Sequence, residues 1–173
     1  MRAFIGLGGN VGDPKGSFLA AIRELGGIGQ VVRVSSLYHT APQNFADQPI
    51  FTNAVAEILT ELEPARLLFE CKRIEVLLGR PPDGIRFGPR VVDLDILAFD
   101  GLCVADTELD LIVPHPRLQE RRFVLEPLTE LDPALRPWRN CADLRTDVTV
   151  TDLLPSVADQ DVRRIEGPEW ADR

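Results

Sequence analysis

The stretch Arg86-Phe87-Gly88-Pro89-Arg90-Val91-Val92-Asp93-Leu94-Asp95-Ile96-Leu97 combines two arginines, a Gly-Pro turn and two carboxylates within twelve residues. From Val91 onward it is mostly apolar and β-branched, which predicts a strand over residues 91–99. Because side chains alternate between the two faces of a strand, Asp93 and Asp95 share one face, opposite Val92, Leu94 and Ile96. The segment therefore presents two carboxylates from an otherwise apolar strand.

Two carboxylates this close on a half-buried strand face repel each other unless a cation lies between them. Mg²⁺ prefers oxygen ligands and usually binds through one or two carboxylates together with substrate phosphates. The alternative is that Asp93 and Asp95 are solvated on an exposed sheet face, since aspartate is mostly an exposed residue. The two aspartates alone leave both interpretations open.

Three arginines near this strand favour the metal interpretation. Arg80 precedes and Arg86 follows Pro81-Pro82-Asp83-Gly84, a segment too rich in Pro and Gly for a helix or a central strand. This loop, together with Arg90, brings guanidinium groups to the start of the Asp-bearing strand. Guanidinium binds phosphate through two parallel hydrogen bonds and keeps its charge. The arrangement predicts a site for a nucleotide triphosphate with Mg²⁺.

The whole chain limits the class of protein. At 173 residues with 45% hydrophobic content, we expect a single domain over residues 1–173, and the order of the short tail from about residue 166 is left open. The net charge of −8 argues against nucleic acid as a partner. No apolar run approaches the ~20 residues of a membrane span, and no signal-peptide pattern begins the chain. We therefore expect a cytoplasmic protein with no membrane partner.

Cys71, Cys103 and Cys141 are odd in number and widely spaced, without a Cys-x-x-Cys pair. This pattern predicts three reduced thiols, mostly filling the core, rather than a metal site or a disulfide framework.

The rest of the sequence alternates strand and helix patterns. We predict strands over residues 3–7, 31–37, 54–59 and 162–165, an extended piece over 111–113, and helices from Pro14, from Pro64, within 116–131 and over 152–154. Gly8-Gly9-Asn10 is interpreted as a tight structural turn, with a phosphate-binding turn as the alternative. Residues 40–49 suit a functional loop. A turn at Asp100-Gly101 permits antiparallel pairing, which favours α+β over a doubly wound parallel sheet.

Residues 87–97 resemble the signature of the 6-hydroxymethyl-7,8-dihydropterin pyrophosphokinase family, usually Trp-Gly-Pro-Arg-x-x-Asp-Leu-Asp-Ile. Three more segments resemble family motifs in the same order and spacing. Residues 7–13 are similar to its opening Gly-Ser-Asn-Leu-Gly-Asp, residues 35–40 with 47–53 to its pterin-binding segment, and residues 113–116 with 121–123 to its second nucleotide segment. Four motifs in register are more specific than any one of them.

The resemblance implies a ferredoxin-like α+β sandwich, mainly an antiparallel sheet covered by helices. It implies transfer of pyrophosphate from ATP to the hydroxymethyl group of 6-hydroxymethyl-7,8-dihydropterin, giving AMP, in folate biosynthesis. ATP and the pterin are the expected partners of an expected monomer, and two Mg²⁺ ions are the expected cofactors, held by Asp93 and Asp95.

The resemblance also implies three sets of site residues. The catalytic set is Arg80, Arg90, Asp93 and Asp95. The pterin set is Thr40, Pro42, Phe51, Asn53, Phe87 and Phe123, with Phe87 where the family usually has Trp. The nucleotide set is Arg80, Arg86, Arg90, Ile96, His115 and Arg121.

Without the resemblance, Phe51 and Phe123 would be interpreted as core aromatics, Asn53 as a strand-edge residue, His115 as a surface turn residue and Arg121 as solvated. Three functions are therefore weighed. The leading one is the pyrophosphokinase. The others are a nucleotide-sugar transferase, which also uses Asp-x-Asp, and a ligand-binding regulatory module or pseudoenzyme that binds pterin or nucleotide without turnover.

Overall fold

A computed structural model describes residues 1–41, 49–80, 89–99, 101–142 and 146–172. Its first half runs β1 (Arg2–Gly9), α1 (Pro14–Gly26), β2 (Gln30–Val34), β3 (Leu37–Thr40), β4 (Phe51–Leu59), α2 (Pro64–Leu77) and β5 (Asp93–Phe99). Its second half runs β6 (Val104–Asp106), β7 (Leu111–Val113), a 3-10 helix (Leu118–Glu120), α3 (Arg122–Leu131), α4 (Val150–Leu153), a 3-10 helix (Leu154–Val157), β8 (Val162–Glu166) and a 3-10 helix (Pro168–Asp172).

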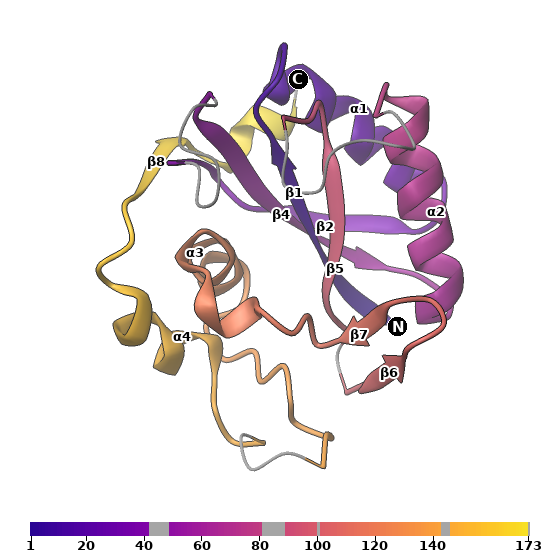
Figure 1. Ribbon diagram of the computed structural model, residues 1–173, viewed down its shortest axis with the longest axis vertical. Coiled ribbons are helices and arrows are strands. Elements are labelled where there is room, and N and C mark those ends of the chain that lie inside the picture. The colour runs from indigo at the N-terminus through magenta and orange to yellow at the C-terminus, as the bar shows by residue number, and fades with distance from the viewer. Residues whose placement is uncertain (42–48, 81–88, 100, 143–145, 173) are drawn as a thin grey trace.

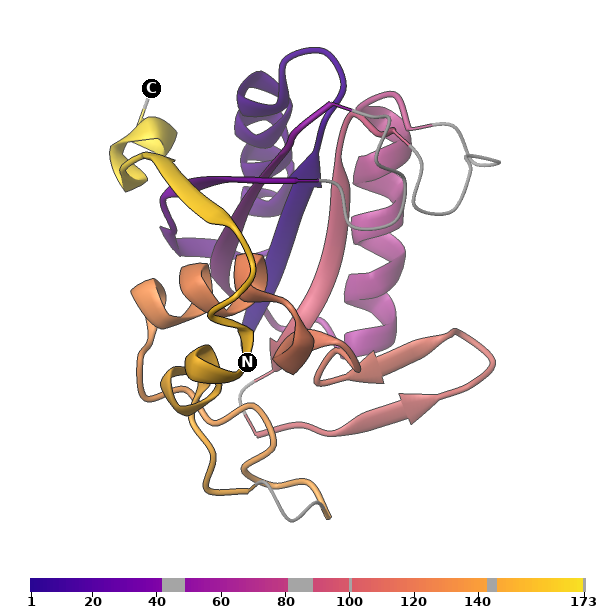
Figure 2. The ribbon, with the colours of Figure 1, turned by 60° about the vertical axis from the view of Figure 1, so that its left-hand side comes forward.

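The main sheet has the strand order β5-β1-β4-β3-β8, and β2 also pairs with β4. Every pair is antiparallel, and β6 and β7 form a separate antiparallel hairpin. Figures 1 and 2 show α1 and α2 on one face of the main sheet and α3 and α4 on the other. The predicted ferredoxin-like α+β sandwich, mainly an antiparallel sheet covered by helices, is confirmed.

Two apolar cores flank the sheet. The first lies between the sheet and helices α1 and α2, and it includes Phe18, Leu67 and Ile74. The second lies under α3 and α4, and it includes Leu125 and Val150. Both cores pack against the same sheet, one on each face.

The two long helices begin as the sequence predicts. The Asp13 side chain caps α1 by accepting a hydrogen bond from the Gly16 N–H, and Pro14 and Pro64 each occupy a first-turn position, where proline costs no hydrogen bond. Gly79, just beyond α2, has a φ of +96°, a backbone conformation that favours glycine. Of the helices in the described ranges, none is both long and apolar enough to cross a bilayer.

Two local predictions near the N-terminal strands are wrong. Residues 31–37 form not one strand but two, because the buried Ser35 accepts a hydrogen bond from the Val55 N–H (2.9 Å) and Ser36 binds the carboxylate of Glu130. Gly8 and Gly9 are not a turn but the end of β1. A Cβ on Gly9 would lie 2.5 Å from the Val91 carbonyl oxygen, so glycine permits a close backbone contact there.

The C-terminal segment, whose order the sequence left open, is part of the core. Trp170 in the last 3-10 helix is fully buried, and its Nε1–H donates to the Ser35 carbonyl (2.8 Å). Its ring lies edge-on to Phe18 of α1, with the centroids 6.3 Å apart. This contact closes the first core at the level of α1.

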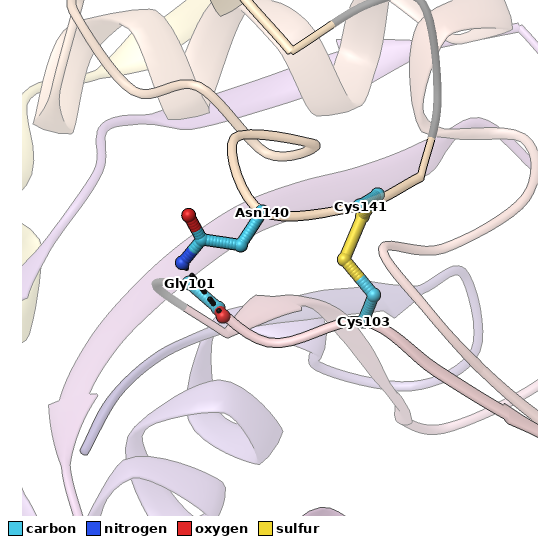
Figure 3. The surroundings of a disulfide bond; sticks show 4 residues. All are labelled: Gly101, Cys103, Asn140 and Cys141. Atoms are coloured by element: carbon cyan, nitrogen blue, oxygen red, sulfur yellow. Dashed lines mark hydrogen bonds between the residues drawn. A yellow bond between two sulfur atoms is a disulfide. The ribbon is translucent and has the colours of Figure 1, made fainter.

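The cysteine prediction is wrong for two of the three residues. Cys103 and Cys141 form a disulfide, with their Cα atoms 5.5 Å apart and a separation of 38 positions in the sequence (Figure 3). The fold brings the start of β6 against the segment that follows Trp138, a proximity that sequence spacing does not reveal. Cys71 is a buried free thiol, as predicted.

Candidate active site

A cleft of about 470 Å³ opens beside β5, the edge strand of the sheet. Each predicted site residue that the structure describes lines this cleft: Thr40, Phe51, Asn53, Arg80, Arg90, Asp93, Asp95, Ile96, His115, Arg121 and Phe123. Pro42, Arg86 and Phe87 lie outside the described residues. The four sequence motifs thus converge on one cavity, large enough for small ligands.

Two glycines of β1 form part of the floor of the cleft. Gly8 pairs with Asp93 of β5 on one side and with Asn53 of β4 on the other, and Gly6 likewise lies next to Asp95. β1 lies between β5 and β4. Because glycine has no side chain, only the β1 backbone separates the two aspartates from β4 at these positions. Gly8 therefore leaves room for a ligand there, whereas the space beside Gly6 is filled by the Leu97 side chain, 3.3 Å from where a Cβ would lie.

The alternation predicted for the Asp-bearing strand is confirmed. Asp93 and Asp95 are half-buried, whereas Leu94 between them is fully buried in the first core. Arg80 and Arg90 each place a guanidinium nitrogen on a different carboxylate oxygen of Asp93. Burial alone would raise the pKa of Asp93, but the Arg90 and Arg80 charges outweigh it and hold that pKa below its ordinary value. Asp93 is therefore an anion held by two cations.

Glu75 of α2 is a buried carboxylate behind this ion pair, and the sequence analysis missed it. Its Oε2 accepts from Arg80 Nη1 (2.8 Å), and its Oε1 accepts from Lys72 Nζ (2.8 Å) and from the Leu94 N–H (2.7 Å). Burial raises the pKa of Glu75. The sequence contains a sign of this role: Glu75 lies four residues after Cys71, so it is a charged residue on the apolar face of α2. Glu75 joins α2, Arg80 and β5.

Asn10, at the end of β1, is a second residue that sequence reasoning missed. Its Oδ1 accepts from the Arg90 N–H (2.9 Å), and its own N–H donates to the Arg90 carbonyl (2.9 Å). Its Nδ2 donates to the Pro49 carbonyl (3.2 Å), just before β4. Asn10 therefore ties the backbone that carries Arg90 to the backbone that leads to Phe51.

Two phenylalanines line the cleft, each beside a guanidinium. Arg90 Cζ lies 5.9 Å from the centre of the Phe51 ring, and Arg121 Cζ lies 5.5 Å from the centre of the Phe123 ring. Both rings are half-buried, and Phe123 also packs against the second core. On β4, Asn53 is buried and its Nδ2 donates to Thr40 Oγ1 (3.0 Å), which fixes the orientation of its amide.

His115 and Arg121 reach the cleft from the segment between β7 and α3. The His115 N–H donates to the Leu97 carbonyl (2.8 Å), and its Nδ1 accepts from the Arg117 N–H (3.1 Å). Burial, followed in size by the charge of nearby Arg117, lowers the pKa of Arg121. Arg121 Nε is buried without a hydrogen-bond partner among the described residues, which leaves a donor for a ligand.

The carboxylates suit Mg²⁺ only together with an anionic ligand. Asp93 and Asp95 are oxygen donors in a cleft that also holds arginines and Lys72. Within the described part of the chain, no group of three or more His, Cys, Asp or Glu side chains forms a metal cage. Mg²⁺ typically binds through one or two carboxylates plus phosphate oxygens, so this donor set fits a metal that arrives with a phosphate.

Comparison with known proteins gives a consistent result. The family model described as "7,8-dihydro-6-hydroxymethylpterin-pyrophosphokinase (HPPK)" matches residues 4–133. The 2-amino-4-hydroxy-6-hydroxymethyldihydropteridine pyrophosphokinase of Methylorubrum extorquens is 44% identical over 137 residues, which is 78% of this chain and 84% of that protein. The protein of the same name in Bacillus subtilis is 45% identical over 131 residues, which is 75% of this chain and 77% of that protein.

Longer proteins also match. A mitochondrial folate synthesis bifunctional protein of Arabidopsis thaliana is 47% identical over 129 residues, 73% of this chain but 23% of that protein. A crystal structure of wild-type Plasmodium falciparum HPPK-DHPS with pterin and p-hydroxybenzoate superposes with a TM-score of 0.64 at 15% identity. The match covers 90% of this chain and 42% of that one, and at this identity it supports the fold alone.

Proposed function

The chain belongs to the 7,8-dihydro-6-hydroxymethylpterin-pyrophosphokinase family, and on that premise we propose that its cleft carries out the family's reaction. Pyrophosphate passes from ATP to the hydroxymethyl group of 6-hydroxymethyl-7,8-dihydropterin, giving AMP and the pterin diphosphate for folate biosynthesis. The observation that carries the assignment of residues is the convergence of the aspartates, arginines and half-buried aromatics on one cleft.

We assign the pterin to the part of the cleft between Phe51 and Phe123. A flat heterocycle can stack on both rings, and an aromatic pair contributes ~0.5–1.5 kcal/mol beyond the area that it buries. Asn53 presents an oriented amide to the edge of the ring, held in place by its hydrogen bond to Thr40. Pro42 and Phe87 belong to the same assignment from the sequence motifs.

We assign the triphosphate to the arginines and His115, with Ile96 beside it on β5. Arg80 and Arg90 now neutralise Asp93, and they can move to phosphate oxygens when Asp93 takes up a cation. There they would offset the charge that develops on the transferred group. Arg121 supplies its unpaired Nε–H as a further donor, and Arg86 completes the set from its motif.

Mg²⁺ dependence is part of this proposal. Asp93 and Asp95 would hold two ions, and bound Mg²⁺ would supply positive charge to offset the phosphates and to lower the pKa of the attacking hydroxyl. Glu75, which also pairs with Lys72, keeps Arg80 near the cleft, so that it is available as a phosphate ligand.

We also propose that the protein is a single-domain monomer in the cytoplasm with no nucleic-acid or membrane partner. Its net charge of −8 supports the absence of a polyanionic partner, and its two cores on one sheet support a single domain. Light scattering of the purified protein tests the monomer.

The decisive experiment incubates the protein with Mg²⁺, ATP and the pterin, and separates AMP from ADP by chromatography. AMP formed in step with pterin diphosphate supports the proposal, and Asp95→Ala should abolish it. Asp161→Ala, which removes an exposed carboxylate outside the cleft, is the matched control. ATP binding without AMP would overturn the proposal in favour of a binding-only protein, and the family match already argues against a nucleotide-sugar transferase.

A further inference from the structure

The disulfide closes a covalent ring over residues 103–141. This ring contains the β6–β7 hairpin and the cleft-lining residues between Asp110 and Val124, among them His115, Arg121 and Phe123. The bond joins the start of the hairpin to the segment that follows Trp138 (Figure 3). A bond in this position restrains the second half of the candidate site.

The first strand of the hairpin, β6, depends on this bond more than the rest of the ring does, because Leu111 and Val113 of β7 are buried in the first core. The start of α3 is held independently, because Arg122 binds the carbonyls of Ala158 and Gln160 and Leu125 is fully buried. His115 is held to β5 by its hydrogen bond to Leu97. The hairpin's link to the segment after Trp138 consists, among the described contacts, of the disulfide and the hydrogen bond from Asn140 Nδ2 to the Gly101 carbonyl (3.1 Å).

The hairpin also touches the ligand space. Asp110, Leu111 and Ile112, at the start of and within its second strand, line the same cleft as the arginines assigned to the triphosphate, and Ile112 pairs with Ala105 of β6. Asp110 has a φ of +50°, an uncommon conformation for a residue other than glycine. A change at the start of the hairpin would therefore be felt on the nucleotide side of the cleft, whereas Phe51 and Asn53 on β4 lie outside the ring.

The disulfide is open to exchange. Cys103 is exposed and Cys141 is half-buried, so a thiolate can reach the bond from solvent. Cys71, by contrast, is fully buried in the first core, and burial raises the pKa of its thiol to about 12. Cys71 therefore does not compete in the exchange. In cytosolic proteins, disulfides are usually transient and redox-sensing rather than structural.

We propose that Cys103–Cys141 is a reversible thiol–disulfide switch that sets the affinity of the cleft for ATP through the position of the β6–β7 hairpin. A dithiol reductant gives two electrons and two protons to the bond, which becomes two thiols while the reductant becomes a disulfide. A low-molecular-mass disulfide such as oxidised glutathione takes the two electrons back and restores the bond through a mixed disulfide. The inference rests on the proposed function, because ATP is the ligand whose affinity changes.

The test compares the oxidised, dithiothreitol-reduced and glutathione-reoxidised protein. Thiol titration and mass spectrometry count the free thiols, calorimetry measures the affinity for a non-hydrolysable ATP analogue with Mg²⁺, and the AMP assay gives the KM for each substrate. We expect reduction to weaken nucleotide affinity at least fivefold, reoxidation to restore it, and the KM for the pterin to change less than twofold. Parallel reductions with glutathione and with a Cys-x-x-Cys protein reductant identify which source of thiol acts.

Two variants sharpen the result. Cys103→Ser with Cys141→Ser should bind nucleotide like the reduced protein and ignore reductant, and Cys71→Ala should respond like the native chain. Equal nucleotide affinity in the oxidised and reduced native protein would overturn the switch, as would a bond that millimolar dithiol leaves intact in the folded state. An oxidised protein that makes no AMP would instead refute the proposed function, so the two failures are distinct.

Discussion

Replacing Glu75 by Gln tests whether a residue outside the predicted site controls an arginine inside it. Glutamine keeps the size of the side chain, and its Oε1 can still accept from the Leu94 N–H and from Lys72. Its amide nitrogen, however, is a donor where Arg80 Nη1 now finds a carboxylate oxygen at 2.8 Å. The substitution therefore removes one ion pair and leaves the Arg80 guanidinium paired with Asp93, while the Arg80 N–H still donates to the Glu75 carbonyl (3.0 Å).

The magnitude follows from the contact that is lost. A hydrogen bond to a charged group contributes ~1.5–3 kcal/mol. If Arg80 must be positioned by Glu75 to reach phosphate in the transition state, the whole amount appears in kcat/KM, as a decrease of about 10- to 150-fold. We expect a decrease in kcat/KM for ATP within this range, while the KM for the pterin stays unchanged, as measured by AMP formation.

Glu70→Gln is the matched control. Glu70 lies on the same helix and is also buried, but its partners Arg66 and Arg73 do not line the cleft, whereas Arg80 does. Both variants should unfold at lower urea concentrations than the native protein, whereas only Glu75→Gln should lose activity. If folded Glu75→Gln turns over ATP within twofold of the native rate, Glu75 does not position Arg80 and the reasoning is refuted.

Three other changes probe the site and the core. Burial lowers the pKa of His115, whose Nδ1 accepts from the Arg117 N–H, so below about pH 6.5 the unfolded chain binds a proton that the folded chain does not. In urea titrations, the native protein should therefore lose more stability between pH 7.5 and 5.5 than the His115→Asn variant does. Parallel stability curves for the two proteins would contradict this. Trp170→Phe leaves the buried Ser35 carbonyl without its donor and should lower the free energy of unfolding by ~1–3 kcal/mol, and Trp170→Ala by ~3–5 kcal/mol; native denaturation midpoints for both would show that this segment is not docked. Arg121→Lys keeps the charge but removes the buried Nε donor, and calorimetry should show ATP binding weakened by ~1.5–3 kcal/mol, with unchanged affinity as the contrary result.

Local sequence patterns predict the parts of this fold that local physics controls. The alternation around Leu94 predicts which face of β5 carries the aspartates, because burial on one face of a strand has a period of two. Pro14 and Pro64 mark the helix starts, because proline fits the first turn of a helix. These features depend on neighbours within a few residues, so a short segment of sequence is enough to predict them.

The missed features depend on partners far away in the chain. Ser35 breaks an apparently continuous strand through a hydrogen bond to Val55, 20 residues later. Cys103 meets Cys141, which lies 38 positions later in the sequence. Asn10 binds the backbone of Arg90, 80 residues later, and in the sequence it reads as part of a turn. No periodicity encodes such contacts, so the supporting residues of the site became visible only in three dimensions.

The two glycines in the floor of the cleft have a consequence for how such a protein can evolve. Glycine inside a strand is less stable than alanine by ~0.5–1 kcal/mol, and a Cβ on Gly8 would meet nothing nearer than Asn53 Oδ1 at 3.6 Å. The fold would thus accept alanine at Gly8 and gain stability, but the new methyl group would stand between Asp93 and Asn53. Selection for thermal robustness alone would gradually fill the cavity. The open floor is kept only while selection for turnover opposes that drift, so a lineage released from catalysis should lose Gly8 before it loses the core.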